Sequence, residues 1–99
     1  MLQQANVNAM VFLSYLWQQQ SITAEHPSLQ DAYAKGAHHF GRAAECAERG
    51  YEFGMQQESW FAYFGLKQAR RGIRIDRIGK ILQTISSRNI FKRAHFPRR

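Results

Sequence analysis

The sequence predicts an all-α protein, a compact bundle of about four helices that ends in a basic C-terminal helix and tail. Apolar residues recur three and four positions apart over most of the 99 residues, which is the period of an amphipathic helix. Pro27, Gly50 and Gly72 interrupt this pattern and mark the expected helix boundaries. The composition, 44% hydrophobic and 21% charged, is typical of a folded globular protein. The single cysteine, Cys46, excludes an internal disulfide and favours a cytoplasmic location.

Residues 5–20 are expected to form the first helix. Val7, Met10, Ser14 and Trp17 lie three or four positions apart, and further apolar residues occupy the other sides of the helix. A helix that is apolar nearly all round is buried on several sides, so we predict that this segment packs into the core. Its apolar run of about nine residues is far shorter than the roughly 20 that cross a bilayer.

The second helix is expected to begin at Ser28, which forms an S-x-x-D capping pattern with Asp31. It is predicted to stop at Gly50, because glycine readily adopts the left-handed conformation of a helix C-cap. Gly36 and Gly41 inside this segment each cost about 1 kcal/mol relative to alanine, which indicates the close approach of another helix. The expected contact seam repeats at intervals of four and three: Leu29, Tyr33, Gly36, Phe40, Ala43 and Ala47.

The third helix is expected at Met55–Arg71 and is rich in aromatic residues. Phe53, Trp60 and Phe64 align on one of its faces. Large aromatic side chains dominate the energetics of cores and interfaces. We therefore predict that this band is core, or core combined with a homodimer interface.

Gly72 is predicted to separate the third helix from a fourth, residues 73–87. A single helix through residues 66–88 would place basic and apolar residues on the same face, whereas a new start after Gly72 separates them. The alternation of residues 73–76 leaves a short strand as an alternative. Residues 1–88 are then one helical domain, and residues 89–99 a basic, partly flexible tail. The expected core residues of the fourth helix are Ile75, Ile78, Ile81, Leu82 and Ile85, and its outer stripe is Arg77, Lys80, Thr84 and Arg88.

Positive charge is concentrated in the last third of the chain. Residues 67–99 hold 11 of the 14 Lys and Arg residues but one of the 7 acidic residues, so they carry +10, while residues 1–66 carry −3. This asymmetry predicts an anionic partner, either nucleic acid or an acidic protein surface. Aromatic residues among the cations of the tail suit single-stranded nucleic acid, whose bases stack on such rings. The expected binding residues are Lys67, Arg70, Arg71, Arg74, Arg77, Lys80, Arg88, Lys92, Arg93, Phe96, Arg98 and Arg99.

These features predict a non-enzymatic protein that binds DNA or RNA mainly through phosphate contacts. The alternative is a protein-binding adaptor or inhibitor, for example from a mobile genetic element, that docks on an acidic surface of a larger machine or nucleoprotein complex. A helix-turn-helix made of Met55–Arg71 and Ile73–Ser87 is a further alternative, although the break between them is shorter than the usual turn. A homodimer fits each hypothesis. Membrane-surface binding is disfavoured, because the core needs the isoleucines.

No pattern in the sequence indicates catalysis, a cofactor or a small-molecule substrate. The chain has no G-x-S-x-G elbow, no glycine-rich phosphate loop and no H-E-x-x-H pair. His39 and Cys46 lie about 10 Å apart along the second helix and there is no second cysteine, so we expect no metal site. His38 and His39 are expected to point in different directions, one toward a polar group and the other toward solvent.

Overall fold

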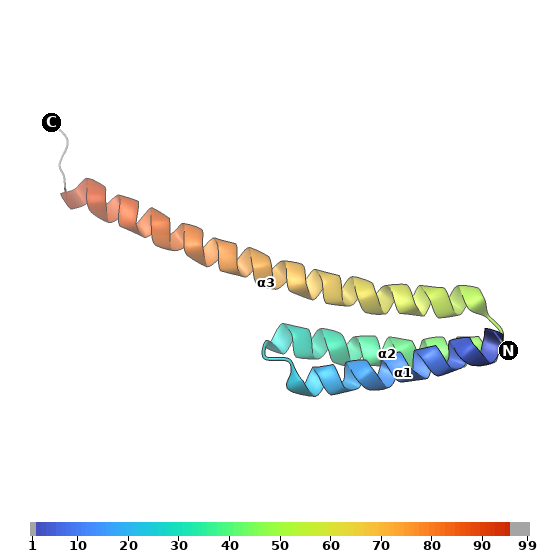
Figure 1. The fold of residues 1–99 in the computed structure, drawn as a ribbon. Coiled ribbons are helices and arrows are strands. Elements are labelled where there is room, and N and C mark those ends of the chain that lie inside the picture. The colour runs from blue at the N-terminus through green and yellow to red at the C-terminus, as the bar shows by residue number, and fades with distance from the viewer. Residues whose placement is uncertain (1, 96–99) are drawn as a thin grey trace.

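The protein consists of three α-helices joined by short turns (Figure 1). The computed structural model describes the backbone of residues 2–95 and the side chains of residues 2–86. The helices are α1 (Leu2–Thr23), α2 (Pro27–Glu48) and α3 (Glu52–His95), and no strand occurs in the described range. The predicted all-α class is confirmed. The predicted count of four helices is wrong, because the third and fourth expected helices are a single one.

The turn between α1 and α2 is fixed by His26 and Pro27. His26 has extended backbone angles, φ −95° and ψ 131°, and its Nδ1 accepts a hydrogen bond from the backbone N–H of Ser28 at 3.1 Å. Pro27 follows as the first helical residue, where its missing N–H costs nothing. The predicted cap at Ser28 is therefore wrong by two positions, and Asp31 instead forms an ion pair with Lys35 at 3.0 Å.

The turn between α2 and α3 depends on Gly50, as predicted. Its φ of +73° lies in the left-handed region that favours glycine. The N–H of Gly50 bonds to the carbonyl of Ala47 at 3.0 Å, and the N–H of Tyr51 to the carbonyl of Cys46 at 2.9 Å. These two bonds form a Schellman motif, which satisfies the last carbonyls of α2 and reverses the chain.

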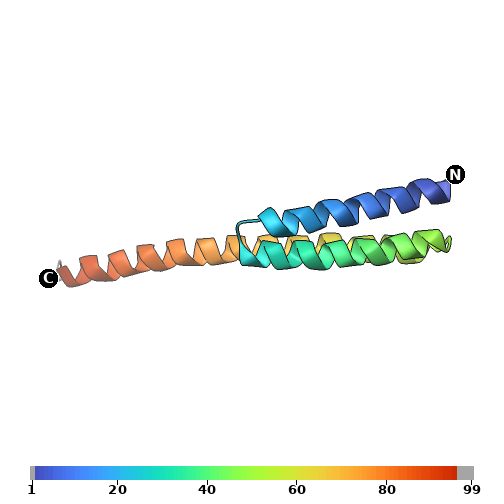
Figure 2. The same cartoon turned by 90° about the horizontal axis from the view of Figure 1, so that it is seen from below.

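The core lies where α2 packs along both α1 and α3 (Figure 2). Phe40 of α2 is fully buried, and Trp17 of α1 is 6% exposed. The Trp17 ring makes edge contacts with Phe40 and with Tyr63 of α3, at centroid distances of 4.9 and 5.3 Å. Ser14 of α1 adds a hydrogen bond to the carbonyl of Ala37 at 2.8 Å. The aromatic rings thus join all three helices around one point of α2.

The predicted seam of α2 is confirmed, and Gly36 has the expected packing reason. Gly36, Phe40, Ala43 and Ala47 are buried along this seam. A Cβ at Gly36 would lie against the six-membered ring of Trp17. Glycine therefore lets α1 and α2 approach closely enough to bury this ring.

Helix α3 runs through Gly72 without a break, contrary to our prediction. It has 44 residues, about 66 Å at roughly 1.5 Å per residue, and it extends well beyond the other two helices (Figure 1). The molecule measures 79 × 25 × 15 Å, with a radius of gyration of 21.5 Å. A compact domain of this length would have about 13 Å. The expected compact bundle, the strand at residues 73–76 and the helix-turn-helix are therefore all wrong.

The bundle ends near Ile73, which explains why α3 does not turn back at Gly72. Ile73 is the last partly buried residue of α3 among those whose side chains are described, and every residue from Arg74 to Ser86 is exposed. A glycine within a helix costs only about 1 kcal/mol. With no apolar groove beyond Ile73 to receive a fourth helix, continuing α3 costs less than folding it back. The helix includes residues 89–95, where we expected a tail, and residues 96–99 lie outside the described range.

Many apolar side chains that we assigned to the core are instead exposed. The prediction that α1 is buried on several sides is wrong. Its backbone packs along α2, only side chains such as Trp17 reach α3, and Val11 and Phe12 are exposed to solvent. The aromatic band of α3 is also largely exposed rather than core. In the last two expected helices, the residues that were predicted to be core but are exposed are Phe53, Trp60, Phe64, Ile75, Ile78, Ile81, Leu82 and Ile85. Within residues 2–95, none of the helices combines the length and apolarity needed to cross a membrane.

Candidate nucleic-acid interface

The unbroken course of α3 gathers five cations on one side of the helix. At about 100° per residue, Lys67, Arg70, Arg71, Arg74 and Arg77 fall within an arc of about 120°. All five are exposed, and we call them the basic face. Lys80 is also exposed but lies about 60° outside this arc. The expected break at Gly72 would have set the two halves of this cluster at an arbitrary angle.

The first part of the basic face lines a shallow groove beside the bundle. Tyr63, Leu66, Lys67, Arg70, Arg71 and Arg74 enclose about 600 Å³ there. Arg70 Nη2 donates a hydrogen bond to the hydroxyl oxygen of Tyr33 at 3.3 Å, which links the start of the basic face to α2. Arg77, the remaining cation of the face, lies past the bundle on the projecting half of α3, residues 74–95.

Carboxylates do not neutralise the basic face. The ion pairs among the described side chains all lie elsewhere: Lys35 with Asp31, and His39 and Arg42 with Glu58. Asp76, the one acidic residue after Glu58, sits about 160° around the helix from the centre of the face. The basic face therefore has a positive electrostatic potential, which attracts a polyanion.

Apolar residues share this side of α3 with the cations. Ile78 and Ile81 fall within or close to the same arc. We considered such mixing unfavourable for a helix that must bury one face. In the structure this half of α3 packs against no core, and both isoleucines are about half exposed, so cations and apolar residues can share one side of the helix.

The remaining predicted site residues are only partly placed. Arg88, Lys92 and Arg93 belong to α3, but their side chains lie outside the described range. Phe96, Arg98 and Arg99 fall beyond the described residues altogether. The structure thus places nine of the twelve predicted residues on one helix and describes the side chains of six of them.

A second polar cluster joins α2 to α3 through His39, whereas His38 is exposed, as predicted for adjacent histidines that point in different directions. His39 Nδ1 lies 2.8 Å from Glu58 Oε1, and Arg42 Nε lies 3.7 Å from the same oxygen. The Glu58 side chain is only 15% exposed, so its carboxylate lies between the two helices. His39 and Glu58 are 19 positions apart and on different helices, so Glu58 could not be identified as the partner before the fold was known.

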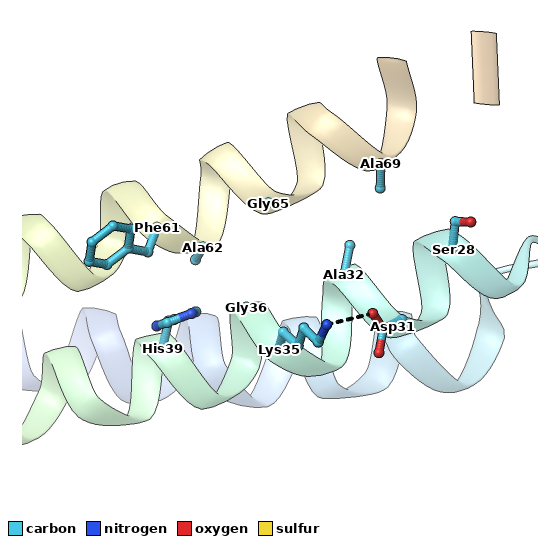
Figure 3. A pocket seen from close by; sticks show the side chains of 10 residues that line it. All are labelled: Ser28, Asp31, Ala32, Lys35, Gly36, His39, Phe61, Ala62, Gly65 and Ala69. Carbon is cyan, nitrogen blue, oxygen red and sulfur yellow. Dashed lines mark ion pairs between the residues drawn. The ribbon is translucent and has the colours of Figure 1, made fainter. Parts of the chain in front are cut away.

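A small pocket adjoins this cluster between α2 and α3 (Figure 3). It has a volume of about 310 Å³, with His39 and Phe61 at one end and the Lys35–Asp31 ion pair at its rim. Its floor is formed by Gly36 and Ala62. Within the described part of the chain, no three His, Cys, Asp or Glu side chains are placed to hold a metal ion. His39 and Glu58 are best explained as a tie between two helices.

Comparisons with protein-family models, with curated proteins and with solved structures find no match for this chain.

Proposed function

We propose that this chain is a small non-enzymatic protein that associates with DNA or RNA, chiefly through phosphate contacts of the basic face. The observation that carries the proposal is the set of exposed cations without carboxylate partners on one side of a helix that projects from its bundle. Each cation that neutralises a phosphate releases condensed counterions, and this release drives binding without regard to base sequence.

The dimensions of the projecting half of α3 suit a nucleic-acid duplex. Residues 74–95 extend about 33 Å at roughly 1.5 Å per residue. A helix about 10–12 Å across is comparable in width to the major groove of B-DNA, about 12 Å. The bundle lies at one end of α3 only, so it leaves room for a duplex beside residues 74–95. Isoleucines on the same side add apolar contacts but no base-reading hydrogen bonds, which favours backbone recognition.

Salt-dependent binding tests this proposal. Fluorescence anisotropy of a labelled duplex and a labelled single strand is measured over a range of salt concentrations. Removing two phosphate contacts with Arg74→Gln/Arg77→Gln should flatten the plot of log affinity against log salt by about 1.8 for a duplex. The matched control, Lys35→Gln/Arg49→Gln, removes the same charge from the bundle and should leave the slope nearly unchanged. Equal effects of the two pairs, or binding that ignores salt, would refute the proposal.

The exposed aromatic residues of α3 favour a second candidate function, a protein-binding adaptor or inhibitor. Phe53, Trp60 and Phe61 line an open hollow of about 380 Å³ on the bundle half of the helix. Aromatic and arginine side chains dominate the hot spots of protein interfaces. An affinity capture after nuclease treatment separates the two functions. A stoichiometric protein partner that is lost with Phe53→Ala/Trp60→Ala would favour the adaptor, and loss of all partners with the nuclease would favour nucleic acid.

A further inference from the structure

One side of α3 carries an exposed apolar row, in an aromatic and an aliphatic part, that no part of the described chain covers. Its members lie about 120–180° around the helix from Ala62, Leu66 and Ile73, the residues that face the bundle. Their exposed fractions run from 39% for Phe61 to 60% for Leu82. We call this set the outer row, and it comprises Phe61, Phe64, Ile75, Ile78, Leu82 and Ile85.

The outer row has the spacing of a coiled-coil seam. Phe61, Ile75 and Leu82 share one heptad position, and Phe64, Ile78 and Ile85 occupy another three residues later. Gln68 and Arg71 fill the two positions between the aromatic and the aliphatic parts. This pattern extends through Gly72, so it exists only because α3 is unbroken.

A row of glycines runs beside this seam at strict heptad spacing. Gly65, Gly72 and Gly79 are each seven residues apart, and a Cβ added at any of them would meet nothing within 4 Å. Unlike Gly36, they therefore have no packing reason within the protomer. Small residues along one edge of a helix let a second helix approach closely, which would give all three glycines the same explanation.

We propose that the outer row packs against the outer row of a second copy of this chain, with the two α3 helices antiparallel. The seam is complementary to itself in this orientation. When Phe64 of one copy lies beside Ile75 of the other, Phe61 lies beside Ile78, and the two-fold axis repeats both pairs. The two aromatic residues of each copy thus meet Ile75 and Ile78 of the other, while Leu82 and Ile85 lie beside Gln57 and Gly54 of the other copy. A parallel pair would place aromatic rings against each other.

Charge favours the antiparallel over the parallel orientation. Residues 52–64 contain no lysine or arginine, and of their two glutamates Glu58 is paired with His39 and Arg42, so their exposed charge is the −1 of Glu52. Residues 75–86 contain Arg77, Lys80 and Asp76 and carry +1. An antiparallel pair sets these unlike segments together twice. A parallel pair sets −1 against −1 and +1 against +1. Helices α1 and α2 lie on the other side of α3, so they do not obstruct either approach (Figure 1).

The area is sufficient for a specific dimer. Residues 53–86 extend about 50 Å, and a helix about 10 Å wide presents roughly 500 Å² over this length. The two copies together bury at least about 1,000 Å², the lower bound of a specific interface. The true accessible area is larger than this projection, because side chains interdigitate.

The centre of such a dimer is strongly cationic. Residues 65–74 of the two copies pair with each other, which brings Lys67, Arg70, Arg71 and Arg74 of both chains around the axis. Their repulsion is screened when the Debye length falls from about 10 Å at 0.1 M salt to about 3 Å at 1 M. Salt should therefore strengthen self-association, whereas it weakens nucleic-acid binding. The dimer does not require the proposed function. Arg71 and Ile78 belong to both surfaces, so the opposite dependence on salt is what separates the two ideas.

Sedimentation equilibrium of the full chain tests the dimer. We expect twice the 11.5 kDa mass of the chain, and a dissociation constant that falls at least threefold between about 0.1 M and about 1 M salt. Ile75→Gln/Ile78→Gln should raise this constant at least tenfold. The matched control, Val11→Gln/Phe12→Gln, changes two exposed apolar residues of α1 and should leave it unchanged. A monomer at every salt concentration, or equal losses in both variants, would overturn the proposal.

Two further variants test close approach and orientation. Gly72→Leu meets open space in the protomer, so it should raise helix content while weakening the dimer at least tenfold. In a Cys46→Ala background, chains with Phe64→Cys should form mixed disulfides with chains carrying Ile75→Cys, because the two positions adjoin across the antiparallel pair. If Gly72→Leu strengthens the dimer, or if Phe64→Cys chains cross-link only with themselves, the antiparallel seam is wrong.

Discussion

Replacing Gly36 with alanine is the most direct test of how the three helices meet. An added Cβ would lie against Cε3 and Cζ3 of Trp17, and 3.5 Å from the Cβ of Ala62 on α3. Trp17 cannot move aside, because edge contacts with three other aromatic rings hold its own ring in place. The extra methyl group must therefore push α1 away from α2, which opens the core around Phe40.

Two opposing effects set the size of the change in stability. Alanine favours a helix by about 1 kcal/mol over glycine. Overpacking a close-packed core costs about 1–3 kcal/mol, and the fixed ring of Trp17 places Gly36→Ala at the upper end. We expect a net loss of about 2 kcal/mol in the free energy of unfolding. At about 4–8 °C per kcal/mol for a domain of this size, the melting temperature should fall by about 8–16 °C.

Gly65→Ala is the matched control, because a Cβ at Gly65 meets nothing within 4 Å. It should gain about 1 kcal/mol from helix propensity alone. The difference between the two variants, about 3 kcal/mol, isolates the packing cost at Trp17. Urea denaturation followed by circular dichroism measures the free energy of unfolding of both variants, at a protein concentration where the chain is monomeric. The two values are compared only if the free energy falls with urea at the same slope in both variants. If Gly36→Ala is as stable as Gly65→Ala, the close approach of α1 and α2 is wrong.

Two other substitutions separate the core from the exposed apolar surface. Phe40→Ala should cost about 3–5 kcal/mol in urea denaturation, because Phe40 is fully buried and its removal leaves a cavity between three helices; a loss below about 1 kcal/mol would place the core elsewhere. Ile81→Gln, by contrast, should change the free energy of unfolding of the monomer by less than about 0.5 kcal/mol, because Ile81 is 53% exposed. A loss above about 2 kcal/mol would show that Ile81 is buried in a core.

The parts of the fold that the sequence predicted are those set by local contacts. The seam of α2 could be recognised because its small residues, such as Ala43 and Ala47, recur with the period of a helix and are buried in that register. Gly50 could be assigned because a helix C-cap needs a residue at positive φ. The six described cations of the candidate site were also identified from the sequence, since charge is visible without a fold.

The largest errors come from equating an apolar side of a helix with a core. Ile75 and Leu82 have the spacing of core residues, but spacing alone does not show whether another helix is present to cover them. The sequence predicts a break at Gly72, because a break there separates the isoleucines from the cations. In solvent, however, a helix tolerates both a glycine and a face that carries cations beside isoleucines. That the cations form one face could not be predicted, because it depends on α3 running through Gly72 without a break.

Segment length explains both the bundle and the projection. Helices α1 and α2 have 22 residues each, and an antiparallel partner of α2 can be covered over about the same length. Counted from Glu52, 22 residues of α3 end at Ile73, the last partly buried side chain described, and the remaining 22 end at His95. The chain is therefore four segments of equal length, of which three form the bundle. Because the fourth projects, the bundle does not depend on its side chains, so Arg74, Arg77 and Ile78 can be replaced to test binding and self-association without unfolding the protein.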